Sequence, residues 1–82
     1  MPNWEKIVER WLQTGNVDTT IPGDRLLAVL TSKFGVGYKG TRGSHAQVRR
    51  IVRGQEFNST IVLTRELSRG EAKTVLKQLG LV

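Results

Sequence analysis

The first part of the chain carries apolar residues at the period of a helix. One face of that helix would hold Trp4, Ile7, Val8, Trp11 and Leu12. Asn3 can cap its first turn, and Thr14-Gly15 can end it. The pattern predicts a helix over residues 4–13. A connector over residues 15–23 follows, because threonines, Asp18 and Pro22 supply turn chemistry there.

A second stripe of helical period follows the connector. It consists of Leu26, Leu27, Leu30 and Phe34. Gly35 is placed to stop the helix. The stripe predicts a second helix over about residues 23–33.

The last helix has the most complete set of sequence signals. Ser68 and Glu71, three residues apart, form the pattern of a capping box. The apolar stripe that follows is Ala72, Val75, Leu76 and Leu79. Gly80 is expected to close the helix with a positive φ, so that Leu81 packs back.

Between the second and last helices the period changes from 3.6 to 2. Val36 and Tyr38 alternate with small or polar residues, which predicts a short strand over residues 36–39 and a turn over 40–43. A second strand begins at Ser44. Its apolar face would hold Ala46, Val48 and Val52, and its polar face His45, Gln47, Arg49 and Arg53, although Arg50 and Ile51 interrupt the pattern.

A second turn and a third strand complete the predicted sheet. Residues 54–58 read as the turn, and the β-branched run over residues 59–64 reads as the strand. The order α-α-β-β-β-α predicts one α+β domain over residues 1–82. The strands should form an antiparallel sheet with the helices on one face and the other face open.

Composition narrows the class of protein. The 82 residues include no cysteine, which excludes a disulfide framework and a thiolate site. The N-terminus lacks the pattern of a signal peptide, and no apolar run reaches the length of a membrane span. We therefore expect a cytoplasmic protein with no membrane partner.

Charge is distributed unevenly along the chain. Residues 1–35 carry as many acids as cations, so the net charge of +6 lies entirely in residues 36–82. The acid-free stretch from Tyr38 to Arg53 holds Lys39, Arg42, Arg49, Arg50 and Arg53. Such a stretch is typical of a surface that neutralises phosphates, although a solvated face without function is the alternative. An anionic membrane fits less well, because no long apolar helix face accompanies the cations. RNA is the expected partner.

His45 is the only histidine and begins the second strand on its polar face. Histidine is the side chain that most readily both takes and gives a proton near neutrality. RNA cleavage needs a proton removed from the 2′-hydroxyl and cations beside the phosphorane. The alternative is an ordinary surface histidine. Ser44 beside it forms no triad, and the two tryptophans lie at core spacing, so we expect packing rather than base stacking.

The segment Gly40-Thr41-Arg42-Gly43-Ser44-His45 and the stretch from Glu66 to Leu81 resemble the HicA toxin family. Members are small endoribonucleases of bacterial toxin–antitoxin systems with a fold similar to double-stranded RNA-binding domains. The resemblance covers roughly residues 24–82. It implies that residues 1–23 are an added helix and connector.

The resemblance implies specific roles. His45 would be the catalytic histidine, and Gly43 and Ser44 would form the turn that presents it. The family cuts messenger RNA without a metal or other cofactor, and a HicB-type antitoxin covers the histidine. This chain departs from the family in the strand after His45, which is usually more aromatic or histidine-rich, and in Leu63-Thr64-Arg65, where a proline-and-histidine stretch is common.

Three functions stay open on the sequence. The first is a metal-independent endoribonuclease (an mRNA interferase toxin) that uses His45, with RNA bound by Lys39, Arg42, Gly43, Ser44, Arg49, Arg50 and Arg53. The second is a non-catalytic RNA-binding module that holds phosphates on the same basic strand. The third is a protein-interaction domain in which the first helix docks an acidic partner.

Overall fold

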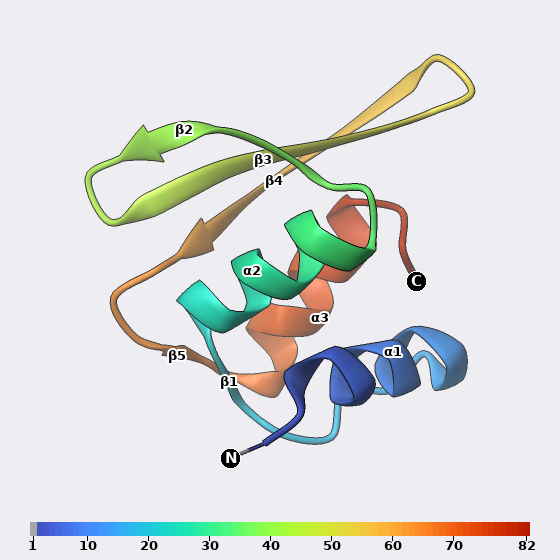
Figure 1. The fold of residues 1–82 in the computed structure, drawn as a ribbon, viewed down its shortest axis with the longest axis vertical. Coiled ribbons are helices and arrows are strands. Elements are labelled where there is room, and N and C mark those ends of the chain that lie inside the picture. Colours follow the sequence, from blue (N-terminus) through green and yellow to red (C-terminus); the bar gives the residue numbers. More distant parts are fainter. Residues whose placement is uncertain (1) are drawn as a thin grey trace.

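The computed structural model describes residues 2–82, so Met1, the first residue of the predicted N-terminal extension, lies outside the described residues. These residues form a small α+β domain (Figure 1). Its elements are α1 (Trp4–Thr14), β1 (Ile21–Pro22), α2 (Gly23–Lys33), β2 (Gly37–Arg42), β3 (His45–Val52), β4 (Gln55–Val62), β5 (Glu66–Leu67) and α3 (Arg69–Gln78).

The main sheet has the order β2-β3-β4, and both pairs of strands are antiparallel. Figure 1 shows α2 and α3 against one face of this sheet, with α1 packed farther from it. No helix of residues 2–82 covers the opposite face of the sheet, as the sequence predicts. The far end of the β3–β4 hairpin extends past the helices.

Two strands are longer than the sequence predicts. β2 continues to Arg42 instead of ending at residue 39, which leaves a turn of only Gly43-Ser44. β4 begins at Gln55 instead of residue 59. Apart from Phe57, the residues missed in each case are polar or glycine and give no alternating hydrophobic signal, but they pair with β3 across the sheet. Cross-strand pairing therefore overrode local sequence preference.

The connector after α1 is tied to the rest of the domain by a small second sheet that the sequence did not predict. β1 pairs with β5, and Ile21 lies opposite Leu67. Val17 and Ile21 are buried. Asp18 accepts a hydrogen bond from the indole nitrogen of Trp11 at 2.9 Å. Residues 15–23 are thus a packed part of the domain.

The core lies between the sheet and the helices. Its fully buried large side chains are Val8, Trp11, Ile21, Leu26, Leu30, Val48, Ile61, Leu76 and Leu79. Trp4 is partly buried against the same cluster. Both tryptophans therefore pack in the core, as predicted from their spacing.

The helix ends follow the chemistry read from the sequence. Asn3 Oδ1 accepts from the backbone of Lys6 at 3.2 Å. Ser68 and Glu71 form a complete capping box. Gly80 has φ 70°, and the backbone nitrogen of Leu81 donates to the carbonyl of Leu76. These bonds satisfy backbone groups that a helix terminus leaves free.

Candidate nucleic-acid interface

The open face of the main sheet is built from alternate residues of β3. His45, Gln47 and Arg49 point away from the helices, whereas Ala46 and Val48 between them are buried. Residues that pair across the sheet share a face. The strand alternation predicted from the sequence is therefore confirmed for these five residues.

His45 stands at one end of this face. It begins β3 directly opposite Arg42, the last residue of β2. Gly43 begins the turn between them with φ 62°, at the position where a type II′ turn requires glycine. The carbonyl of Ser44 accepts from the backbone nitrogen of Leu63 at 2.8 Å. The turn is thus anchored to the chain beyond β4, and it presents an exposed imidazole next to a guanidinium.

A β-bulge brings a lysine onto the same face. The register of β2 against β3 shifts between Tyr38 and Gly40, so that Lys39 is the extra residue. Its Nζ donates to Asn58 Oδ1 of β4 at 3.3 Å. Because β3 lies between β2 and β4, the lysine side chain crosses the middle of the open face.

The third cation of the open face is Arg49. Its Nη1 lies 3.9 Å from Glu56 Oε1, and both side chains are nearly half exposed. An ion pair of this length and exposure is weak. The guanidinium is therefore free to exchange the carboxylate for a phosphate.

The open face therefore carries an excess of positive charge. Among the described residues, it holds three cations, Lys39, Arg42 and Arg49, and one carboxylate, Glu56. Along β3, Arg49 lies about 13 Å from His45, since a strand advances about 3.3 Å per residue. A nucleic acid lying along β3 would meet the two residues at different phosphates.

Arg50, one of the residues expected to bind RNA, lies on the opposite face of the sheet. It pairs with Phe57, and its Nη1 donates to the carbonyls of Leu79 at 3.0 Å and Gly80 at 3.3 Å. A cation at these carbonyls offsets the partial negative charge of the C-terminus of α3. Its role in the structure is to join the hairpin to the helix.

Arg53, another expected RNA contact, lies at the tip of the β3–β4 hairpin. It forms the two-residue turn with Gly54, and both have positive φ, 52° and 81°. These angles match a type I′ turn. The tip is about 26 Å along β3 from His45. Arg53 is exposed but does not share a site with the imidazole.

No carboxylate of the described residues is hydrogen-bonded or ion-paired to His45. Within residues 2–82 its one side-chain contact of hydrogen-bonding length is the Ser44 hydroxyl, 3.4 Å from Nδ1. None of the four ion pairs formed by the described residues includes it. The imidazole is therefore accessible and is held by the backbone turn alone.

The titratable groups with shifted pKa values lie away from this face. Hydrogen bonds from Arg65 and from the backbone of Ser68 lower the pKa of Glu71 to about 2. The same pair raises the pKa of Arg65. A hydrogen bond from Trp11, aided by the charge of Arg10, lowers the pKa of Asp18. These groups stabilise the helix side of the domain.

In residues 2–82, no group of three or more histidine, aspartate or glutamate residues lies close enough together to hold a metal ion. No helix in that range is long and apolar enough to cross a membrane.

No known protein family, characterised protein or solved structure matches the chain. The likeness to HicA toxins, carried by residues 40–45 and 66–81, therefore stays a prediction. The function proposed for the chain depends on the geometry of the open face.

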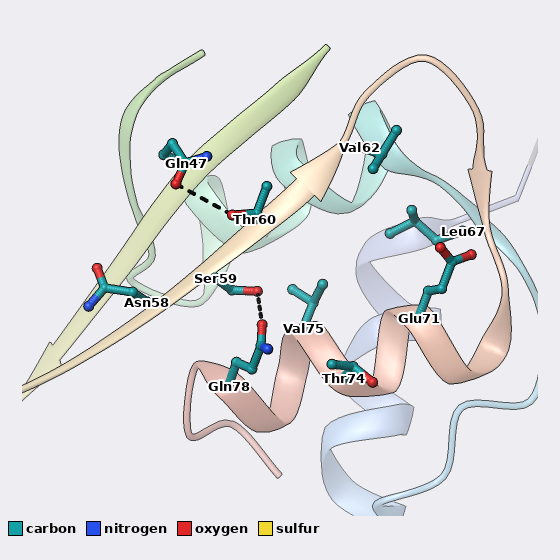
Figure 2. A pocket seen from close by; sticks show the side chains of 10 residues that line it. All are labelled: Gln47, Asn58, Ser59, Thr60, Val62, Leu67, Glu71, Thr74, Val75 and Gln78. Atoms are coloured by element: carbon teal, nitrogen blue, oxygen red, sulfur yellow. Dashed lines mark hydrogen bonds between the residues drawn. The ribbon is translucent and has the colours of Figure 1, made fainter. Parts of the chain in front are cut away.

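Sequence reasoning missed a groove beside this face. Figure 2 shows it between β4 and α3, with Asn58 and Thr60 on the strand and Thr74 and Gln78 on the helix. It was missed because residues 54–58 read as a turn. Phe57 is the one apolar residue from Gln55 to Thr60, so this stretch shows no apolar–polar alternation that would mark a strand.

Proposed function

We propose that the protein is a metal-independent endoribonuclease that uses His45 as its general acid and base. The observation that supports this most directly is the placement of His45 opposite Arg42 at the exposed end of a cationic sheet face. A proton acceptor beside a cation is the minimum that RNA cleavage through the 2′-hydroxyl requires.

In the proposed reaction, neutral His45 accepts the proton of a ribose 2′-hydroxyl as that oxygen attacks the adjacent phosphorus. The bond from phosphorus to the 5′-oxygen then breaks. The leaving oxygen takes a proton from water, because the chain has no second histidine and no cysteine to supply one near neutrality. Protonated His45 then acts as the acid and returns its proton to the hydroxide that remains. The products are a 2′,3′-cyclic phosphate and a 5′-hydroxyl.

The cations would have separate roles. Arg42 is near enough to His45 to offset the charge that develops on the phosphorane. Lys39 and Arg49 would hold phosphates farther along the strand and set the register of the RNA. Gly43 and Ser44 would keep the approach to the imidazole free of bulky side chains.

The biological setting is proposed from the resemblance to HicA toxins. We infer a cytoplasmic mRNA interferase of a toxin–antitoxin pair, with a double-stranded RNA-binding-domain-like fold over residues 24–82. Its partner would be a HicB-type antitoxin that covers His45. The +6 net charge supports an acidic partner for the same face.

Expression in bacteria from a tightly controlled promoter tests this proposal. The wild-type protein should stop growth and shorten the lifetime of messenger RNA, whereas His45→Ala should do neither. Gln47→Ala, two residues along the same face, is the matched control and should keep most of the effect. Equal toxicity and equal RNA decay for wild type and His45→Ala would contradict the proposal.

A non-catalytic RNA-binding module is the second candidate. It is favoured by the absence, within residues 2–82, of a carboxylate bonded to His45. This reading predicts RNA binding that weakens steeply between about 50 and 200 mM salt, without cleavage. Arg49→Ala should reduce the slope of log affinity against log salt by about one. An RNA affinity that does not change over this range of salt would count against the binding module.

A further inference from the structure

The two edges of the main sheet differ in how far they resist pairing with another strand. The β2 edge carries a bulge at Lys39, two glycines and two charged side chains. Such features are typical of protected edges. β4 pairs with β3 over all eight residues without a register shift and contains no proline, glycine or lysine. No strand of residues 2–82 pairs with its outer edge.

The turn geometry identifies which backbone groups of β4 face outward. A two-residue type I′ turn closes on a hydrogen-bonded pair, here Val52 and Gln55, and bonded and non-bonded pairs then alternate. The N–H and C=O groups of Glu56, Asn58 and Thr60 therefore point away from β3. They form a row of alternating donors and acceptors at the spacing of a β-ladder.

The groove between this edge and α3 adds side-chain donors (Figure 2). The oxygen of each of three amides already accepts a bond: Asn58 Oδ1 from Lys39, Gln47 Oε1 from Thr60 and Gln78 Oε1 from Ser59. Each amide NH₂ group is left to donate, and none has a partner among the described residues. The carboxylate that lines the groove, Glu71, is paired with Arg65.

We propose that the free edge of β4 binds an extended, acidic segment of a partner protein by strand addition. The backbone row of β4 matches a peptide backbone. The amide donors of Gln47 and Asn58 match carboxylates that the added strand turns to the open face, and that of Gln78 matches one turned to the helix face. The net charge of +6 favours an acidic segment further. This proposal does not depend on catalysis by His45, which lies on the open face.

Other occupants fit less well. RNA can donate from its 2′-hydroxyls and bases, but it has no regular row of backbone N–H groups to match the outward carbonyls of β4. A second copy of the chain would bring two +6 charges together across the strand pair.

Nuclear magnetic resonance titration of the ¹⁵N-labelled full chain tests the proposal. The probe is an acetylated eight-residue peptide of alternating threonine and glutamate. Saturable shifts are expected at the amides of Glu56, Asn58 and Thr60 and at the side-chain amide of Gln78. The same peptide with alternate backbone nitrogens methylated should bind about tenfold more weakly, because it cannot complete the ladder.

Matched variants test the charge. Gln78→Glu places a carboxylate in the groove and should weaken binding, whereas Gln13→Glu adds the same charge on exposed α1 and should not. Equal binding of the methylated peptide, or of a threonine–lysine peptide, would overturn the proposal. It would also be overturned if an RNA octamer bound more tightly than the peptide and shifted the same amide resonances. A shift of those resonances with protein concentration alone would overturn it as well.

Discussion

At the scale of single residues, Gly23 sets how closely α2 can approach the sheet. A Cβ atom at this position would lie 1.7 Å from the carbonyl oxygen of Val62. The backbone nitrogen of Gly23 also donates to the carbonyl of Arg65 at 3.1 Å. The start of α2 is thus packed directly on the chain that leaves β4, and only glycine fits there.

Gly23→Ala is therefore expected to lower the free energy of unfolding by about 2–3 kcal/mol, because the backbone must move to admit the methyl group. Gly70→Ala is the control. Gly70 is exposed on α3 with nothing within 4 Å of the added Cβ atom. The change should therefore raise the free energy of unfolding by about 0.5 kcal/mol. Urea unfolding of the two variants measures both values. Equal stability of the two would contradict the close packing at Gly23.

Glu71 gives a pH dependence with a definite sign. Its pKa is lowered from an ordinary 4.5 to about 2 by Arg65 and the cap of α3. A carboxyl whose pKa falls on folding adds stability that is fully present above about pH 4.5 and is lost as the pH falls through 2. The protein should therefore lose stability between these values.

Glu71→Gln should be less stable than wild type at neutral pH and should show a flatter stability profile between pH 5 and 2. Glu66→Gln removes a carboxylate that forms no ion pair among the described residues, and it should keep the wild-type profile. Thermal melts across this range measure the effect. A wild-type profile in Glu71→Gln would show that the cap does not hold the carboxylate.

At the scale of elements, the sequence predicted the helices well and the hairpins less well. Helix ends depend on local signals, such as the capping box at Ser68 and the glycine at Gly80, which can be read from a few neighbouring residues. The start of β4 at Gln55 depends on pairing with β3, and no local pattern encodes it. The pairing of β1 with β5 joins residues more than 40 positions apart and was invisible for the same reason.

The β3–β4 hairpin separates two arginines that the sequence grouped together. Arg50→Met should lower the free energy of unfolding by about 1 kcal/mol, because the carbonyls of Leu79 and Gly80 lose their donor. Arg53→Met should leave stability unchanged and weaken RNA binding slightly. Urea unfolding and a filter-binding assay on both variants make the comparison. A loss of RNA affinity in Arg50→Met without loss of stability would contradict the placement of Arg50.

At the scale of the whole molecule, the cationic side chains and the candidate catalytic histidine lie on the face of the sheet opposite the core. The helices bury the apolar side chains on one face of the sheet, and the other face carries Lys39, Arg42, His45 and Arg49. The sequence predicted the basic face because strand alternation is a local property. It did not predict that Lys39 reaches Asn58, which needs the bulge, or that the edge of β4 borders a groove, which needs the packing of α3.

The central claim is that His45 performs chemistry on bound RNA. The most direct measurement is the single-turnover cleavage rate of a labelled RNA oligonucleotide by purified protein without an affinity tag, for wild type, His45→Ala and the Gln47→Ala control. We predict a rate at least about 100-fold lower for His45→Ala, with RNA affinity nearly unchanged, and a near-wild-type rate for Gln47→Ala. Equal rates for wild type and His45→Ala would contradict the claim.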